Sequence, residues 1–381
     1  MKKKNILLIS HDLNVCGAPN SLLRQAKYFK QAGHDVTVWT LADGPLRPRY
    51  EEAGFSPVVV NNSYDAIVDA YDKTQKNFDF ILCNTIVTYK FVRFFKNITK
   101  NLVWFIRETK LVDDWIRENP EFAKEYTSFQ NIYTVSEYAA TVSKKYNDNI
   151  HWFPNAIADN FHEFHKSKSG VTFGYIGSVI QVKGIDLLVN AFLEINKENP
   201  DTRLIIAGCE GLPLEQELKK LTKNNKNVVW MGQVQGAEKE NFFNSIDVLC
   251  VPSLDDPCPL TVIEGAMLGK AIITTDKVGS NYIVADNVSG FIIKSGDKEQ
   301  LVAAMKKIKS IEIEQMQRES RKQYLKQGTL NRERRDVLNM LKYTINLSKT
   351  KIFQKTVSKK GRVRIYFFGV KIASFKKKAM K

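Results

Sequence analysis

The segment PSLDDPCPLTVIEGAMLGKAIITTD, residues 252–276, indicates how the second half of this 381-residue chain folds. It begins with an acidic loop that contains Asp256. The apolar residues from Leu260 to Leu268 then recur at helical spacing, and Glu264 lies inside that helix. Residues 271–275 are rich in β-branched side chains, which is typical of a buried strand. The segment is therefore predicted to be a loop, a short helix and a strand of an α/β sheet.

Two acids that flank a helix start indicate a site for a phosphorylated ligand. The first backbone N–H groups of a helix are unpaired and lie at the positive end of its dipole, so they attract phosphate. Asp256 can accept hydroxyls on one side of that phosphate, and Glu264 can accept a ribose diol on the other. A plainer interpretation, which the residues leave open, is that Asp256 caps the helix and Glu264 is an exposed helix position.

Strands and helices alternate along both halves of the chain, which predicts an α/β fold with two tandem Rossmann-like domains. Open sheets of this kind bind ligands beyond the carboxyl ends of their strands, so we expect the two domains to face a central cleft. Helices are expected over residues 185–198 and 239–244, and a helical, charged run over residues 300–327. Predicted strands are residues 5–10, 36–39, 58–60, 80–83, 102–106 and 132–135 in the first half, and 172–176, 203–207, 228–231 and 248–251 in the second.

Composition limits the classes of protein to be considered. The five cysteines form no Cys-x-x-Cys pattern, which favours core residues in a reducing compartment over a disulfide framework or a zinc site. No signal peptide is evident, and no run of 18 apolar residues occurs. The net charge is +16, but residues 349–381 hold twelve Lys and Arg and no acid. The basic excess therefore belongs to a short C-terminal tail, and a nucleic-acid-binding core is not expected.

The segment from Asp256 to Glu264 resembles the Glu-x7-Glu motif of glycosyltransferase family 4 (glycosyl transferases group 1), with Asp at the first position. Residues 177–184, GSVIQVKG, are similar to the Gly-Arg-Leu-x3-Lys-Gly segment of that family. The resemblance covers about residues 5–345 and implies a GT-B enzyme of the bacterial surface-polysaccharide type. It implies an N-terminal acceptor domain (residues 1–168), a C-terminal nucleotide-sugar donor domain (169–329), a helix crossing back (330–348) and the tail (349–381).

The resemblance also implies roles for individual residues. Lys183 is expected to neutralise the leaving diphosphate, while Ser178 stands where the family often has a second cation. The alternative for Lys183 is an ordinary solvated side chain in a turn. The donor-binding residues expected are Gly17, Gly177, Ser178, Lys183, Pro259, Leu260, Thr261, Val262 and Glu264. The residues expected to be catalytic are Asp256, Lys183, Glu264, Arg107 and Glu108.

Arg107 and Glu108 follow a predicted strand at the position where relatives carry a His or a His-Glu pair. An arginine cannot act as a base, but its planar fork can hold a sugar hydroxyl, a phosphate or a carboxylate. Glu108 is expected to orient Arg107 or to accept a hydroxyl. A structural ion pair at the end of the strand is the alternative.

The five histidines show no metal-ligand spacing, so no metal site and no cofactor are predicted, and the nucleotide sugar is expected to serve as donor substrate. With the resemblance, these residues predict a retaining, metal-independent glycosyl transfer in capsule, O-antigen or lipopolysaccharide biosynthesis. The expected acceptor is a glycan or a lipid-linked glycan. The alternatives are a catalytically impaired nucleotide- or glycan-binding protein, a sugar-nucleotide epimerase and an NAD dehydrogenase. The last is set aside because no Gly-x-Gly-x-x-Gly follows the first strand.

The tail mixes cations with aromatic and β-branched residues. Residues 363–367 alternate as a strand would, and residues 367–372 can form a hairpin with them. Such a segment suits an anionic membrane surface, where each Lys or Arg contributes roughly 1 kcal/mol. We therefore expect a cytoplasmic protein that is peripheral on the inner face of a bacterial plasma membrane. A solvated tail and a single-stranded nucleic acid are the alternatives.

Overall fold

The structure is a computed structural model that describes residues 2–164, 170–208, 213–310, 313–349, 353–357, 362–367 and 370–376. Side chains are described as far as residue 346, except residues 309–310. The predicted domain boundary at residues 168 and 169 therefore lies outside the described residues. By its contacts the chain divides into two units, one of Met1–Trp104 with Arg335–Lys381 and the other of Phe105–Arg334.

The first sheet has seven strands in the order β3-β2-β1-β4-β5-β6-β7. The pairs β1/β2, β1/β4, β2/β3 and β6/β7 are parallel. Its strands are β1 (Asn5–Ser10), β2 (Asp35–Thr40), β3 (Val58–Val59), β4 (Phe80–Asn84), β5 (Leu102–Ile106), β6 (Ile132–Thr134) and β7 (Ile150–Trp152). Its helices are α1 (Gly17–Gln31), α2 (Arg47–Glu52), α3 (Tyr64–Thr74), α4 (Tyr89–Phe95), α5 (Lys110–Glu118), α6 (Pro120–Ser128) and α7 (Glu137–Ser143), with the 3-10 turn η1 (Ile86–Thr88).

The second sheet has six strands, all paired in parallel, in the order β10-β9-β8-β11-β12-β13. Its strands are β8 (Thr172–Ile176), β9 (Arg203–Ala207), β10 (Val228–Gly232), β11 (Val248–Val251), β12 (Ala271–Thr275) and β13 (Gly290–Ile293). The helices are α8 (Ile185–Glu198), α9 (Pro213–Thr222), α10 (Ala237–Asn244), α11 (Leu260–Met267), α12 (Lys298–Ser310) and α13 (Ile313–Gln327), with the 3-10 turns η2 (Gln181–Lys183) and η3 (Gly279–Ile283). Helix α14 (Leu330–Lys349) begins in this unit and belongs to the other unit from Arg335 onward.

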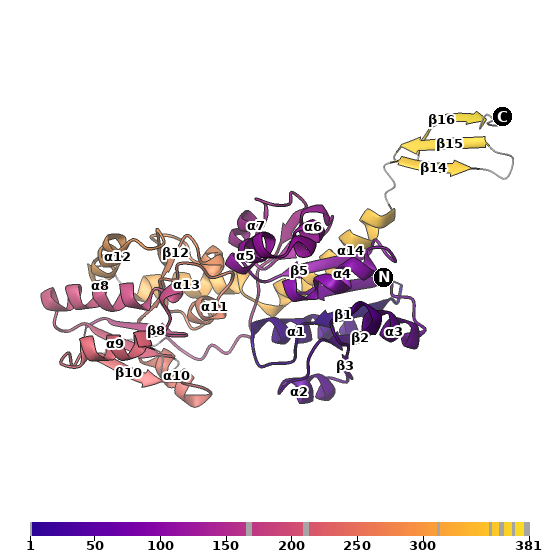
Figure 1. Ribbon diagram of the computed structural model, residues 1–381. Coiled ribbons are helices and arrows are strands. Elements are labelled where there is room, and N and C mark those ends of the chain that lie inside the picture. Colours follow the sequence, from indigo (N-terminus) through magenta and orange to yellow (C-terminus); the bar gives the residue numbers. More distant parts are fainter. Residues whose placement is uncertain are drawn as a thin grey trace. The chain divides into compact units, whose positions relative to one another are not determined.

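Two apolar cores cover the two faces of the second sheet. On one face, side chains of α8, α9 and α12 pack on the strands, and Figure 1 shows α8 and α12 side by side. On the other face, α10, α11 and α13 contribute residues such as Phe242, Val262 and Tyr324. Strands buried on both faces are the reason why residues 248–251 and 271–275 carry no alternating polar positions. The predicted α/β class with two parallel sheets is confirmed.

Most predicted elements match the structure closely. Helix α8 has the predicted bounds, and β1, β5, β8, β9 and β11 agree with the predicted strands. The charged run after residue 297 forms two helices and not one. Helix α12 packs on α8, whereas α13 packs on α11. Strands β7 and β13 were not predicted. Within the described residues, no helix is long and apolar enough to cross a membrane.

The C-terminal segment forms a separate three-stranded antiparallel sheet in the order β14-β15-β16, which Figure 1 shows after the end of α14. Its strands are β14 (Phe353–Val357), β15 (Arg362–Phe367) and β16 (Val370–Lys376). The predicted strand over residues 363–367 and the hairpin that follows it are confirmed by the pairing of β15 with β16. The tail side chains lie outside the described residues.

Candidate functional site

The acidic loop lies between the end of β11 and the start of α11. Pro259 is the N-cap residue of α11, and no side chain caps the helix. The interpretation of Asp256 as a helix cap is therefore wrong. Leu260, Thr261 and Val262 form the first turn, which contains no acidic residue. The start of α11 thus keeps backbone donors that can bind an anion.

Lys183 and Asp256 lie together although 73 residues separate them in sequence. The Nζ atom of Lys183 donates a hydrogen bond to Oδ2 of Asp256 at 2.6 Å. Asp256 is only 7% exposed. Burial raises the pKa of Asp256, and the adjacent Lys183 opposes that shift. Lys183 is therefore not an ordinary solvated side chain, because it neutralises a buried carboxylate before the start of α11.

Gly184 explains how the β8–α8 turn reaches the acidic loop. Its φ is +67°, a conformation that favours glycine, and a Cβ there would lie 2.1 Å from the carbonyl oxygen of Pro252. This close approach sets Lys183 beside the end of β11. Gly177 and Ser178 lie at the start of the same turn, where the hydroxyl of Tyr175 donates to the Ser178 carbonyl at 2.7 Å.

Glu264 forms a second ion pair of the site. Lys239 of α10 donates to its Oε1 at 2.7 Å, whereas Oε2 is buried and accepts no hydrogen bond within the described part of the chain. The Glu264 side chain is 21% exposed, so it is not an ordinary solvated helix position. Glu264 and Lys239 line a cavity of about 230 Å³, together with Phe243 and Met267. Lys239 was not predicted as a site residue, because its only recognisable feature in the sequence is its place on a predicted helix.

The acidic loop is also held by residues that follow β5 and β6. Oδ2 of Asp255 accepts from Thr109 Oγ1 at 2.9 Å, and Oδ1 accepts from the hydroxyl of Tyr138 at 2.6 Å. Burial raises the pKa of Tyr138, so it remains a neutral donor. Thr109 and Tyr138 were not predicted from the sequence, because neither residue belongs to a recognisable motif.

Ser136 has two roles. Its hydroxyl oxygen accepts from the N–H of Ala139 at 3.1 Å and caps α7. The same hydroxyl donates to the carbonyl of Pro257 at 2.6 Å. Gly279 lies against this contact, since a Cβ there would be 1.7 Å from the Pro257 oxygen.

Arg107 is linked to the loop through Asn155. Its Nη1 donates to Asn155 Oδ1 at 3.2 Å, and its guanidinium lies 4.5 Å from the centre of the Phe105 ring. The carboxylate of Glu108 accepts from the backbone N–H of Arg107 at 2.8 Å. Cys258 of the acidic loop is half-buried near Asn155, and desolvation raises the pKa of its thiol to about 11. Glu108 thus contacts the backbone of Arg107, while the half-buried Arg107 guanidinium lies between Asn155 and the Phe105 ring.

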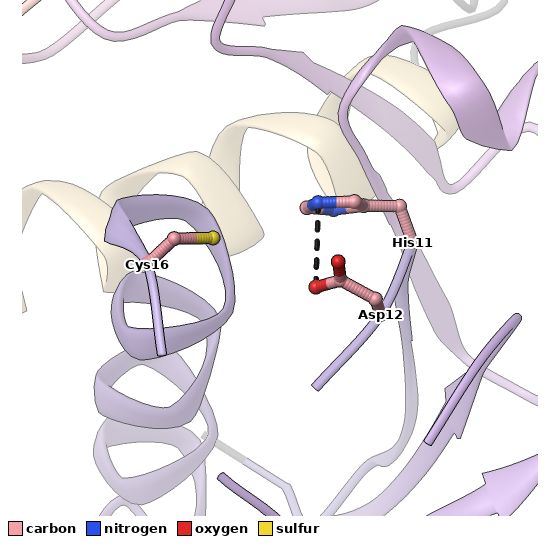
Figure 2. Close-up of side chains that lie close together, drawn as sticks. All are labelled: His11, Asp12 and Cys16. Atoms are coloured by element: carbon pink, nitrogen blue, oxygen red, sulfur yellow. Dashed lines mark ion pairs between the residues drawn. The ribbon is translucent and has the colours of Figure 1, made fainter. Parts of the chain in front are cut away.

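Gly17 belongs to the other unit, where it is the exposed first residue of α1 after the N-cap Cys16. Before it, the imidazole Nε2 of His11 lies 3.4 Å from Oδ1 of Asp12. Cys16 completes a group whose ligand atoms all lie within 4.8 Å of one another. Figure 2 shows the Cys16 sulfur pointing toward the His11–Asp12 pair. The spacing of the histidines in the sequence did not predict this group.

Comparisons with known proteins agree with this architecture. The model of glycosyl transferases group 1 matches residues 157–329, and that of glycosyl-transferase family 4 matches residues 2–152. A capsular polysaccharide biosynthesis glycosyltransferase, CapM of Staphylococcus aureus, is 26% identical over 40% of this chain and 40% of its own length. The O-antigen chain mannosyltransferase C of Escherichia coli is 27% identical over 42% of this chain and 39% of its own length.

The alignments therefore span about two fifths of these relatives. Anabaena HepE, solved in complex with UDP, superimposes with a TM-score of 0.75 over 89% of this chain and 100% of its own, at 14% identity. That likeness shows the fold alone. The two family models, the two parallel sheets and this superposition agree: the chain belongs to glycosyltransferase family 4 and has the GT-B fold.

Proposed function

We propose that this protein is a retaining glycosyltransferase that moves a sugar from a nucleoside-diphosphate sugar to a glycan or lipid-linked glycan in cell-surface polysaccharide biosynthesis. The observation that carries the proposal is the Lys183–Asp256 pair, at 2.6 Å, beside the uncapped start of α11. The names of CapM and the O-antigen mannosyltransferase, and the UDP bound by HepE, support this class of donor and pathway.

Each described group has a role in this proposal. Lys183 and the N–H groups of Leu260 to Val262 hold the diphosphate and stabilise the charge that develops on it. Glu264 accepts the ribose hydroxyls, and its buried Oε2 is available for them. Asp256 accepts hydroxyls of the transferred sugar. The departing phosphate takes the proton of the acceptor hydroxyl, so neither a protein base nor a metal nor a cofactor is needed.

A screen of nucleoside-diphosphate sugars tests the proposal. The purified protein is mixed with each donor in EDTA, and both thermal stabilisation and release of nucleoside diphosphate are measured. We expect one donor to stabilise the protein and to be slowly hydrolysed. Stabilisation without turnover, with every acceptor class tried, would favour a binding protein, and release of an epimerised sugar would favour the epimerase.

Two substitutions separate the roles of the ion pairs. Glu264→Ala is expected to remove most donor stabilisation, and Lys183→Ala to lower mainly the turnover. The exposed pair between Glu194 and Lys298, at 2.8 Å in the same unit, supplies matched controls. Glu194→Ala and Lys298→Ala should bind and turn over the donor like the unmodified protein. Full activity in Glu264→Ala or Lys183→Ala would disprove the role assigned to that residue.

We also propose that residues 349–381 bind an anionic membrane surface and place the protein on the inner face of the plasma membrane. The net charge of these residues supports this, because they hold twelve cations and no acid. Flotation with vesicles that contain phosphatidylglycerol should recover the full chain but not a chain ending at Leu347. Equal flotation of both would contradict the proposal, and displacement by single-stranded RNA would favour a nucleic acid.

A further inference from the structure

We propose that His11, Asp12 and Cys16 bind a divalent metal ion of the Zn²⁺ type through imidazole nitrogen, carboxylate oxygen and thiolate sulfur. The three side chains lie in the loop between β1 and α1, and their ligand atoms are all within 4.8 Å of one another. The three side chains belong to one unit, whereas the proposed transfer chemistry uses Lys183 and the start of α11, which belong to the other.

The chemistry of the three side chains selects the metal. A mixed set of nitrogen, oxygen and sulfur ligands suits Zn²⁺, whereas Mg²⁺ and Ca²⁺ prefer oxygen ligands alone. Three protein ligands leave a fourth position of a tetrahedral ion open for water or an anion. We therefore infer a site of the open kind, unlike the closed four-ligand sites that only stabilise a fold.

The three ligand atoms need to move only a little to reach the spacing around a bound Zn²⁺ ion. Bond lengths to Zn²⁺ of about 2.0–2.3 Å place neighbouring ligand atoms roughly 3.3–3.8 Å apart in a tetrahedron. His11 Nε2 and Asp12 Oδ1 are already 3.4 Å apart. Cys16 is exposed, so rotation of its side chain can bring the sulfur closer by about 1 Å.

The surroundings hold two of the three ligands in position. Asn14 donates from its backbone N–H to Asp12 Oδ1 at 3.1 Å and from its side chain to Oδ2 at 2.5 Å, which fixes the orientation of the carboxylate. Cys16 is the N-cap residue of the 15-residue helix α1, so the helix holds its backbone in place near His11 and Asp12. Figure 2 shows that this sulfur approaches from the helix while His11 and Asp12 approach from the strand end.

Metal binding by the full-length protein tests the inference. After treatment with EDTA, the protein is dialysed against micromolar Zn²⁺, and bound metal is measured by mass spectrometry. We expect one Zn²⁺ per chain, and Co²⁺ should give the near-ultraviolet charge-transfer band of a thiolate ligand. Cys16→Ser should abolish that band, and His11→Gln, Asp12→Asn and Cys16→Ser should each weaken Zn²⁺ binding by at least about tenfold.

Cys258→Ser and His162→Gln are matched controls that should bind Zn²⁺ like the unmodified protein. Absence of stoichiometric Zn²⁺ binding would overturn the inference. Unchanged Zn²⁺ binding in any one of the three loop variants would overturn the three-ligand site. Circular dichroism in EDTA checks that each variant folds. Donor stabilisation measured in EDTA reports on the transferase proposal alone, so failure of one proposal is distinguishable from failure of the other.

Discussion

Replacing Lys183 with methionine should destabilise the protein in a way that depends on pH. The change removes the ammonium group 2.6 Å from Asp256 Oδ2 and leaves a carboxyl that is 7% exposed without its counter-charge. Removing one partner of a fully buried pair costs about 3–5 kcal/mol. The Lys183 side chain is 29% exposed, so solvent screening reduces the expected loss to about 1–3 kcal/mol at pH 7.

The sign of the pH dependence follows from Asp256. Burial raises the pKa of this carboxyl in the folded state and Lys183 lowers it, so Lys183→Met should raise it further. When the pKa of a carboxyl is higher in the folded state, the folded state binds more protons than the unfolded state at a pH between the two pKa values. The free energy of unfolding therefore falls as the pH rises through that interval. The deficit of Lys183→Met should therefore be largest at neutral pH and should shrink as Asp256 is protonated in acid.

Urea unfolding of four proteins measures this effect: the unmodified chain, Lys183→Met, Asp256→Asn and the double variant, each between pH 4.5 and 7.5. The coupling between the two substitutions should be about 1–2 kcal/mol at pH 7, because the double variant has no buried unpaired charge. Lys298→Met, in an exposed pair, is the control and should change stability by less than about 0.5 kcal/mol. A Lys183→Met deficit that is absent, or that is constant across this pH range, would refute the reasoning.

Three further predictions concern stability and are measured by urea unfolding. Gly279→Ala should destabilise the fold by about 2 kcal/mol or more, because the new Cβ would lie 1.7 Å from the Pro257 oxygen and 2.2 Å from Ser136 Oγ; unchanged stability would mean that the loop shifts freely. Ser136→Ala should cost about 1–3 kcal/mol through loss of the α7 cap and the bond to Pro257, and more than Ser136→Thr. Burial lowers the pKa of Lys270 to about 8, so the folded state releases the Lys270 proton at a lower pH than the unfolded state does. Between pH 7 and 9.5 the free energy of unfolding of the unmodified protein should therefore rise by about 2 kcal/mol relative to that of Lys270→Met. A difference that stays constant over this pH range would contradict the lowered pKa.

The fold was largely predictable because local patterns determine it. The apolar spacing of residues 185–198 and the glycine before them predict α8 with its observed bounds. Buried parallel strands such as β11 appear in the sequence as short apolar runs. The division of the charged run into α12 and α13 was not predictable, because it depends on which helices lie opposite each half. Periodicity shows that a face is apolar but not which element covers it.

The candidate site was predictable only where a motif specified it. Asp256 and Glu264 were predicted from two acids that flank a helix start, and Lys183 from the resemblance. The structure brings Lys183 and Asp256 into contact. Lys239 and Tyr138 were missed, because each contacts the site across a long stretch of sequence and neither belongs to a motif. The same reason applies to His11, Asp12 and Cys16. The spacing of the histidines in the sequence does not reveal a group that contains one histidine, one aspartate and one cysteine.

The position of the acidic loop suggests how donor binding can change the site. Asp255 is held by Thr109 and Tyr138, so the loop keeps its place independently of the Lys183–Asp256 pair. A diphosphate at the start of α11 competes with Asp256 for Lys183, and two phosphate charges attract an ammonium more strongly than one carboxylate. We therefore expect Lys183 to change partners on donor binding. Asp256 then loses its counter-charge in a buried setting and needs a new donor, which the hydroxyls of the sugar supply. A donor analogue without those hydroxyls should accordingly bind more weakly to the unmodified protein, whereas Asp256→Asn should discriminate little between the analogue and the true donor.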